Sequence, residues 1–346
     1  MRIVICTMQV PFQQGGAELL VRSLKRELSA RGHQAEIVQL PLSWHFKEGV
    51  LKGYLAWRLL DLAVIEGQTV DLLIACKFPS FAVRHDNKVT WLIQQFRQLY
   101  DLYASEYSPY GHKPEDRDFQ RIIHRADTRT LGESRKLFTI SQNVANRLAR
   151  FNGLQAQTLY PPPPHEGQLY HETYGDYVLV VSRLNVMKRV DMIIRAMAHV
   201  QSGSRCLIAG TGSEEKALKQ LARKLDVGDR VKWLGYVDDA RLLSLYANAM
   251  AVFYAPYDED YGYATVEAFK AHKPVLTASD SGGVLEFVID GETGYVAAPD
   301  YPHALAERID QLAADRSLCR RLGESGYEIV RPITWEGTIR QLLGGL

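Results

Sequence analysis

Short runs of β-branched and other apolar residues alternate along this chain with segments whose apolar positions recur every three to four residues. The first pattern is typical of buried strands and the second of amphipathic helices, and their alternation predicts an α/β fold with parallel sheets. In the first half we expect strands at 2–6, 35–39, 71–76, 88–94 and 136–140. Helices are expected there at 16–31, 51–65 and 115–132.

Residues 159–164, LYPPPP, interrupt this pattern. Proline continues neither a helix nor a central strand, so we interpret the segment as a stiff extended linker between domains 1–162 and 163–329. The second half repeats the alternation, with strands expected at 177–182, 205–209, 230–234, 251–254 and 274–277. A final helical stretch covers 317–346 and is interrupted at Pro332.

Composition fits this division and excludes several classes of protein. The chain has 346 residues, 46% hydrophobic, and suits two domains of about 150–180 residues each. Its net charge of +1 gives no reason to expect nucleic acid. The four cysteines are dispersed without C-x-x-C spacing, which indicates free thiols in a reducing compartment, so we expect a cytoplasmic protein. The apolar start MRIVICTMQV is too short for a signal peptide, and no run is long enough to span a membrane.

The segment 258–273, DEDYGYATVEAFKAHK, carries the most specific chemistry. Glu259 stands eight residues before Glu267, with an aromatic–glycine turn ending at Gly262 between them. A helix beginning near Tyr263 would offer unpaired N–H groups to a phosphate or sugar hydroxyl, and Gly262 would let the backbone approach a ligand. Both carboxylates could then accept hydrogen bonds from hydroxyls in one pocket. The alternative is a solvated acidic loop before an ordinary amphipathic helix.

This segment resembles the signature E-x-F-G-[LYF]-x-x-x-E-A of the family 4 retaining glycosyltransferases, with Tyr261 where phenylalanine is usual. Its continuation, KPVLTASDSGGVLEFVIDGETGYVAAP, looks like the sequel in that family. VSRLNVMKRVDMIIRAM resembles the phosphate-binding strand and helix, and G-G-A-E at 15–18 matches the family's first helix start. The four matches occur in the expected order and cover nearly the whole chain.

The resemblance implies the GT-B fold, two Rossmann-like domains facing across a cleft, with a C-terminal helix at about 330–346 that packs back on the first domain. It places a nucleotide-sugar on the second domain. The expected catalytic residues are Glu259, Arg183 and Lys188. The expected donor-binding residues are Gly15, Gly16, Arg183, Lys188, Tyr236, Val237, Glu259, Gly262, Tyr263, Ala264, Thr265 and Glu267.

These residues have different expected roles. Arg183 and Lys188 would neutralise the pyrophosphate, on which negative charge grows as the glycosidic bond breaks. Glu267 would bind ribose hydroxyls, and Glu259 with the N–H groups at the helix start would hold the sugar and phosphate. Tyr236 and Val237 match the place where relatives recognise the base through backbone groups.

We expect neither a metal nor a cofactor. Asp258-Glu259-Asp260 reads D-x-D, a motif that holds Mg²⁺ or Mn²⁺ in glycosyltransferases of another fold. Here Arg183 and Lys188 already supply positive charge. Gly210-Thr211-Gly212 lacks the third glycine of a dinucleotide fingerprint, which disfavours a dehydrogenase.

On the acceptor side the sequence departs from the family. Where most relatives carry a histidine after a strand of the first domain, Gln94-Gln95 stand here, followed by Arg97. Glutamine binds hydroxyls but cannot relay a proton, so we assign Gln94 and Arg97 to binding near the sugar. His85 is the nearest alternative in the chain, and His112 is another.

Arginines recur every four residues along the predicted helix at 115–132, at Arg117, Arg121, Arg125 and Arg129. Their stripe is either a solvated face diluted by Asp118, Asp127, Glu115 and Glu133, or a surface for an anionic lipid-linked acceptor and a peripheral contact with an anionic membrane. A tyrosine-rich segment precedes it and could line an acceptor groove.

The predicted function is a metal-independent, retaining hexosyltransferase that uses a nucleotide-sugar, UDP favoured, and a glycan, glycolipid or lipid-linked acceptor in bacterial polysaccharide biosynthesis. The alternatives are a GDP-mannose-dependent mannosyltransferase, a nucleotide-sugar epimerase of GT-B type and a non-catalytic sugar-nucleotide binding module.

Overall fold

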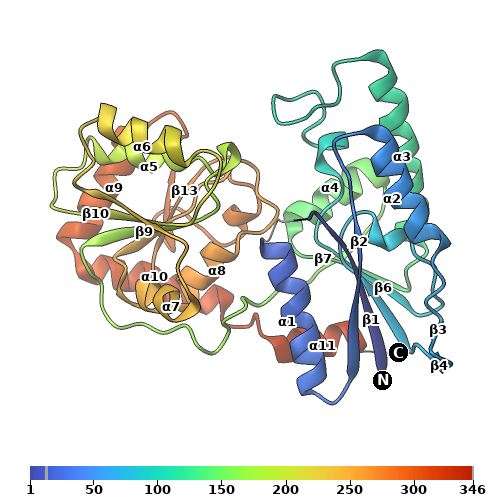
Figure 1. The fold of residues 1–346 in the computed structure, drawn as a ribbon. Coiled ribbons are helices and arrows are strands. Elements are labelled where there is room, and N and C mark those ends of the chain that lie inside the picture. The colour runs from blue at the N-terminus through green and yellow to red at the C-terminus, as the bar shows by residue number, and fades with distance from the viewer. Residues whose placement is uncertain (12–14, 345–346) are drawn as a thin grey trace. The chain divides into compact units, whose positions relative to one another are not determined.

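The computed structural model describes residues 1–11 and 15–344, and these form two compact units. The first unit comprises Met1–Pro164 together with Trp335–Leu346, and the second comprises His165–Thr334. The chain therefore leaves the first unit after the proline run and returns to it with its last helix (Figure 1). The final two residues of the helix expected at about 330–346 lie outside the described residues.

The first unit is built on a parallel six-stranded sheet in the order β2-β1-β5-β6-β7-β8. Its strands are β1 (Arg2–Gln9), β2 (Gln34–Pro41), β5 (Leu72–Ala75), β6 (Lys88–Leu92), β7 (Lys136–Thr139) and β8 (Gln157–Thr158). Its α-helices are α1 (Gly16–Ala30), α2 (Lys47–Leu59), α3 (Pro114–Gly132), α4 (Gln142–Asn152) and α11 (Trp335–Leu343). A separate antiparallel hairpin joins β3 (Val64–Ile65) to β4 (Gln68–Thr69).

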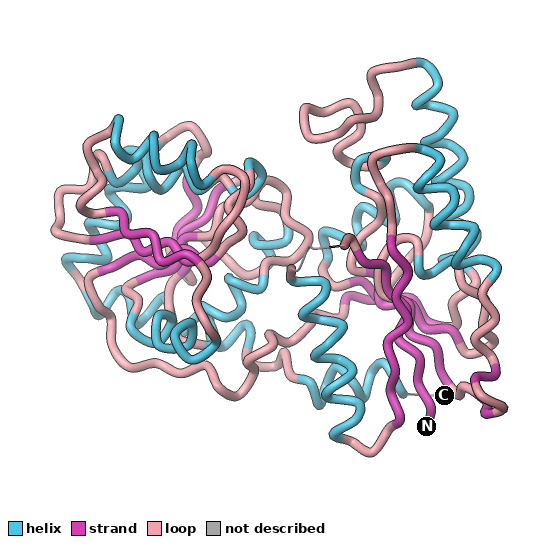
Figure 2. Tube along the Cα trace, in the orientation of Figure 1, coloured by secondary structure: helices cyan, strands magenta, loops and turns pink. Residues whose placement is uncertain are grey.

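The second unit has a parallel six-stranded sheet in the order β11-β10-β9-β12-β13-β14. Helices cover both faces of this sheet (Figure 2). Its strands are β9 (Tyr177–Val181), β10 (Arg205–Ala209), β11 (Val231–Gly235), β12 (Ala251–Phe253), β13 (Val275–Ala278) and β14 (Gly294–Ala297). Its α-helices are α5 (Val190–Met197), α6 (Glu215–Lys224), α7 (Asp239–Asn248), α8 (Tyr263–Lys270), α9 (Pro302–Ala314) and α10 (Arg316–Val330). This is the Rossmann strand order 3-2-1-4-5-6.

Burial explains why the central strands were recognisable from the sequence. All four residues of β5, all five of β6 and all four of β13 are buried, as expected for parallel strands covered by helices on both faces. In the second unit one apolar cluster joins β9, β10, β12 and β13 to α5, α9 and α10. The helix expected at 51–65 is wrong at both ends, because α2 begins at Lys47 and ends at Leu59, and Val64–Ile65 form a strand instead.

The described helices include none that is both long enough and apolar enough to span a bilayer.

Candidate active site

The candidate site of the second unit lies where its strand order reverses. β9 and β12 are neighbours in the sheet, but the chain proceeds from β9 towards one edge and from β12 towards the other. In open parallel sheets, ligands bind beyond the carboxyl ends of the strands at such a switch point. Arg183 and Lys188 follow β9, and Tyr254 and Glu259 follow β12, so the fold brings both halves of the predicted motif to this point.

Lys188, Tyr254 and Glu259 form a hydrogen-bonded cluster there. Lys188 Nζ donates to the Tyr254 hydroxyl at 3.0 Å and forms a close ion pair with Glu259 Oε2. The Tyr254 hydroxyl donates to the same Glu259 oxygen at 3.1 Å. The Lys188 side chain is 15% exposed and that of Glu259 22%, so the cluster is partly sheltered but still open to a ligand.

The electrostatics of the cluster hold Lys188 charged. Burial alone would lower the pKa of Lys188, but the Glu259 carboxylate and the hydrogen bonds of Glu259 and Tyr254 together raise it above its usual value. Burial and the charge of Glu259 raise the pKa of Tyr254 as well. At neutral pH the cluster therefore consists of an ammonium, a carboxylate and an intact phenol hydroxyl.

Local structure fixes the position of Lys188. The short 3₁₀ helix Val186–Lys188 is capped by Asn185, whose side chain accepts a hydrogen bond from the Lys188 N–H at 3.2 Å. Arg189 follows with φ 46° and turns the chain into α5. Its guanidinium makes two hydrogen bonds to Asp280, at 2.8 and 2.6 Å, and also donates to the carbonyls of Ala255 and Pro256. Arg189 thus ties together the loops that follow β9, β12 and β13, and sequence reasoning did not find it.

The turn that carries Glu259 depends on two glycines. Gly262 has φ 90°, and a Cβ there would approach the Tyr254 ring to 2.8 Å and Val284 to 3.0 Å. The glycine therefore accommodates the left-handed turn and the Tyr254 ring. Gly283 donates its N–H to the Glu259 carbonyl at 2.7 Å, and a Cβ there would lie 2.5 Å from the Asp260 carbonyl oxygen.

Glu267 on α8 belongs to a second set of buried polar groups. Glu267 is buried and accepts a hydrogen bond from the Tyr246 hydroxyl at 2.8 Å. Burial raises the pKa of Glu267 to about 7, although the hydrogen bond from Tyr246 acts in the opposite direction. The Tyr263 hydroxyl and Thr265 Oγ1 are also buried and have no hydrogen-bond partner among the described residues. Ala264 lies between them in the first turn of α8 and is buried.

The remaining donor-site candidates of the second unit are more accessible. Arg183 is exposed, and no ion pair of its guanidinium is found within the described ranges. Tyr236 is 84% exposed and Val237 is partly buried; both follow β11, the edge strand of the sheet. These residues come from the carboxyl ends of two different strands, consistent with a ligand that extends along this edge of the sheet.

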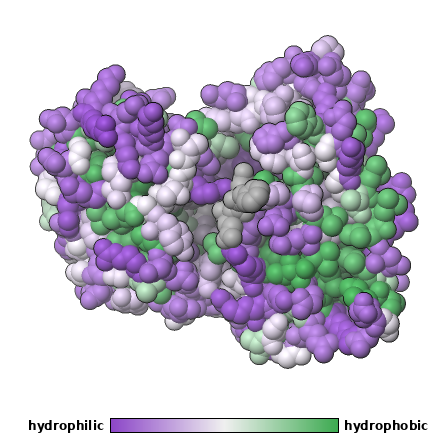
Figure 3. Space-filling view, viewed as in Figure 1, coloured by the Kyte–Doolittle hydropathy of each residue, from purple (hydrophilic) through white to green (hydrophobic). Residues whose placement is uncertain are grey.

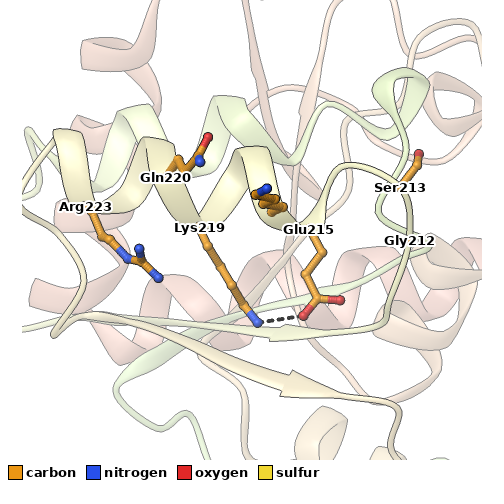
Figure 4. A pocket seen from close by; sticks show the side chains of 7 residues that line it. Gly212, Ser213, Glu215, Lys219, Gln220 and Arg223 are labelled. Carbon is orange, nitrogen blue, oxygen red and sulfur yellow. Dashed lines mark hydrogen bonds and ion pairs between the residues drawn. The ribbon is translucent and has the colours of Figure 1, made fainter.

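The G-x-G at 210–212 has a structural explanation. Gly210 has φ 140°, a Cβ on it would lie 1.8 Å from the Ser182 carbonyl, and one on Gly212 would lie 2.2 Å from that of Leu184. The two glycines therefore let the loop after β10 run in contact with the loop after β9, which bears Arg183. A pocket of about 420 Å³ begins at Gly212 and continues along α6 (Figure 4). Its lining is Gly212, Ser213, Glu215, Lys216, Lys219, Gln220 and Arg223.

In the first unit the strand order reverses between β1 and β5. Gly15 precedes α1 in an extended conformation and Gly16 begins the helix, while Glu18 in its first turn pairs with Lys77 after β5 at 3.2 Å. The glutamate of the G-G-A-E motif therefore joins α1 to the end of β5. The glutamines that precede these glycines, Gln13 and Gln14, lie outside the described residues.

The acceptor-side candidates lie in two different places in the first unit. Gln94 follows β6 and is half-buried, and Arg97 lies three residues on, where it pairs with Asp101. Gln95 is fully buried, and its side-chain oxygen accepts from Arg147 at 3.1 Å.

His85, the alternative sugar-proximal candidate, lies away from Gln94. It precedes β6, at the opposite end of the strand from Gln94, and its ring nitrogens contact the Val70 carbonyl and the Asn87 N–H. His112 contacts the Ser108 carbonyl through Nε2.

Comparison with known proteins finds a family that matches most of the second unit. Residues 167–329, which contain the cluster around Lys188 and Glu259, match the family of glycosyl transferases group 1. This match covers just under half of the chain. The chain is 28% identical to N-acetyl-alpha-D-glucosaminyl L-malate synthase of Bacillus anthracis over 351 aligned positions, which cover 91% of it and 89% of that protein.

Other relatives match over shorter regions. The match to EpsD of Bacillus subtilis is 28% identical over 211 residues, 58% of this chain and 55% of EpsD. The match to D-inositol 3-phosphate glycosyltransferase of Corynebacterium glutamicum is 29% identical and covers 48% and 41% of the two chains. The chain thus spans about half the length of these relatives.

Solved structures establish the fold. Sucrose-phosphate synthase from Thermosynechococcus elongatus matches with a TM-score of 0.75 at 20% identity, covering 99% of this chain and 97% of that one. WaaG, a glycosyltransferase involved in lipopolysaccharide biosynthesis, matches with a TM-score of 0.73 at 18% identity, covering 99% and 100%. Anabaena HepE in complex with UDP matches at 0.70 and 20% identity, covering 99% and 98%. The chain therefore has the GT-B fold.

Proposed function

We propose that this chain is a retaining, metal-independent glycosyltransferase of family 4. It moves a hexose from a nucleotide-sugar, with UDP as the favoured nucleotide, to a glycan, glycolipid or lipid-linked acceptor in bacterial polysaccharide biosynthesis. One observation carries the proposal: the switch point of the second sheet holds a charged lysine, a carboxylate and a phenol in mutual contact. These three groups can bind a donor that contains a pyrophosphate and a polyhydroxylated sugar.

Each group has a distinct task in this reaction. Lys188, with Arg183 from the same loop after β9, binds the pyrophosphate and stabilises the charge that develops when the bond between the sugar C1 and the phosphate oxygen breaks. Glu259 accepts hydrogen bonds from sugar hydroxyls, and the N–H groups of Tyr263 and Ala264 face the phosphate at the positive end of α8. The acceptor oxygen bonds to C1 on the same face, and its proton passes to the departing phosphate oxygen.

The nucleotide preference rests on analogy. HepE is known in complex with UDP, and with UDP and glucose, and TarM in complex with alpha-GlcNAc-glycerol and UDP. The metal-free character rests on the cations already present, Lys188 and Arg183. In the part of the chain that the structure describes, no three His, Cys, Asp or Glu side chains are arranged to hold a metal ion.

Donor affinity should depend on pH through Glu267. Ribose hydroxyls donate hydrogen bonds, so they need the carboxylate, and a pKa of about 7 leaves Glu267 largely protonated in slightly acidic solution. Affinity for UDP-glucose, whose pyrophosphate has no group titrating there, should therefore rise about tenfold between about pH 6 and pH 8. Calorimetric titration measures this change. Glu267→Gln should bind weakly and without the pH dependence, and an unchanged profile in that variant would remove Glu267 from the ribose site.

The raised pKa of Glu267 also makes the stability of the donor-free chain depend on pH. The folded chain retains a proton on Glu267 that the unfolded chain releases between about pH 4.5 and 7. The contribution of this group to the free energy of unfolding therefore falls as pH rises through that range, and donor binding opposes the loss.

Tyr254 is expected to act as a positioning residue. Tyr254→Phe removes the hydroxyl shared by Lys188 and Glu259, so kcat should fall about 2- to 12-fold, the value of one hydrogen bond, with little change in KM for the donor. Steady-state kinetics give both constants. Tyr177→Phe, which loses a hydroxyl bonded to the Leu245 carbonyl, is the matched control, because Tyr177 is a tyrosine of the same unit that is as buried as Tyr254. Equal losses in the two variants would assign Tyr254 a purely structural role.

A further inference from the structure

The charged side chains of α3 differ in burial, which the sequence alone does not show. The helix carries four arginines and four acidic residues, so it is neutral along its length. Two of the acids, Asp116 and Asp127, are buried, at 3% and 0% exposed. All four arginines are exposed; they are Arg117, Arg121, Arg125 and Arg129. Asp127 therefore does not dilute the stripe. Glu115 and Asp118 remain exposed and Asp118 pairs with Arg121, so four arginines against two acids leave the outer face of α3 net basic.

The same side of the first unit also exposes large apolar side chains. Met1 and Leu19 aside, the strongly exposed large hydrophobic residues in the described part of this unit all lie in one group of elements. These elements are α2 with the residue that precedes it, the β3–β4 hairpin and α3. The residues are Phe46, Leu55, Leu59, Val64, Ile65 and Ile122. Leu59 is 82% and Leu55 58% exposed, on the face of α2 opposite its buried residues Val50, Tyr54 and Trp57. Figure 3 shows apolar atoms gathered over this side of the unit.

Contacts between α2 and α3 make one continuous layer of these features. Lys47 at the start of α2 pairs with Asp116 at 2.7 Å, and Arg58 near its end makes two hydrogen bonds to Glu133, at 2.6 and 2.8 Å. Between them the Tyr54 and Thr130 hydroxyls lie 2.7 Å apart. The two helices therefore run side by side in the same direction (Figure 1), and the hairpin follows directly after α2. We call α2, the β3–β4 hairpin and α3 the outer layer.

We propose that the outer layer docks on an anionic lipid bilayer, with the apolar side chains of α2 and the hairpin entering the interface and the arginines of α3 contacting lipid phosphates. Exposed leucine, isoleucine and valine stabilise contact with the boundary of the acyl region, and arginine binds phosphate through its planar fork. Neither signal alone holds a protein firmly on a membrane, but the two together do. A second copy of this chain fits less well, because it would bring a basic surface against a basic surface.

Vesicle binding tests the charge and apolar parts separately. The chain should sediment with vesicles of phosphatidylcholine and phosphatidylglycerol, much less with phosphatidylcholine alone, and less as salt rises. Arg117→Gln with Arg125→Gln should weaken binding by at least about tenfold at low salt. Lys224→Gln with Lys232→Gln makes the same charge change on the second unit, at two exposed positions, and should have little effect. Leu55→Gln with Leu59→Gln should weaken binding at every salt concentration.

A probe on Leu59 tests insertion directly. The four native cysteines are buried, so an environment-sensitive fluorophore can be placed on Leu59→Cys alone. Its emission should shift to the blue and intensify with the anionic vesicles, whereas the same probe on Tyr301→Cys, another exposed large residue, should not respond.

Three results would overturn the proposal. They are no preference for anionic vesicles, a Leu59 probe that stays in water while the chain binds, and a blue shift that follows protein concentration without vesicles, which would assign the layer to self-association. None of these measurements uses a donor, so their outcome is distinct from that of the proposed activity.

Discussion

Lys188→Ala is expected to reduce kcat/KM and UDP affinity by about 10- to 150-fold each, which corresponds to the loss of one charge-assisted hydrogen bond, about 1.5–3 kcal/mol. Lys188 is the cation held at the switch point of the second sheet, between β9 and β12, and its contact with phosphate should strengthen as the leaving group gains charge. Calorimetric titration with UDP and steady-state kinetics measure the two effects. Urea unfolding should show the variant still folded, since the pair with Glu259 is partly open to solvent.

Arg195→Ala is the matched control. Arg195 is a cation of the same unit that pairs with a single carboxylate, Asp191, on the surface of α5. Its removal should leave UDP affinity and turnover unchanged. Wild-type UDP affinity in Lys188→Ala would show that the cluster does not meet the pyrophosphate.

Substitution of Glu259 and substitution of Glu267 should have different effects on binding and turnover. Glu259→Ala is expected to leave UDP affinity nearly unchanged while kcat falls by at least about tenfold, the pattern of a contact made to the transferred sugar in the transition state. UDP lacks that sugar, and removal of Glu259 also frees Lys188 from its ion pair. Glu267→Ala should instead weaken UDP and UDP-sugar binding alike, because ribose is common to both.

Calorimetry with UDP and with UDP-sugar, beside single-turnover kinetics, distinguishes these outcomes. Equal loss of UDP affinity in the two variants would contradict the division of tasks between Glu259 and Glu267.

The central strands were predictable because they are buried on both faces, so their apolar runs are continuous and rich in branched residues. The end of α2 was not predictable, because the apolar pattern of residues 51–65 continues past the helix into the hairpin. Glu66 and Gly67 turn that hairpin with φ 49° and 71°, the positive pair of a type I′ turn, so Gly67 was the available signal. β14 was missed because its four residues, GYVA, follow a glycine-rich turn without a long apolar run.

Some residues of the candidate site could likewise be predicted from the sequence, and others could not. Lys188, Glu259 and Glu267 stand in motifs whose spacing is local, so the sequence indicates them directly. Tyr254 and Arg189 acquire their roles only when parallel strands bring the loops after β9 and β12 together, and that juxtaposition depends on strand order. The burial of Asp127, which makes the outer face of α3 basic, likewise depends on tertiary packing.

The central claim is that the cluster at the switch point binds a nucleotide-sugar without a metal. The most direct measurement is the thermal unfolding midpoint of the chain in EDTA with UDP-, GDP- and ADP-sugars, for the wild type and Lys188→Ala. At a ligand concentration of about 100 times Kd, binding should add about 2.7 kcal/mol to the free energy of unfolding. We predict that UDP-sugars raise the midpoint of the wild type and much less that of Lys188→Ala. No shift with any donor, or a shift that appears only when Mn²⁺ is added, would contradict the account.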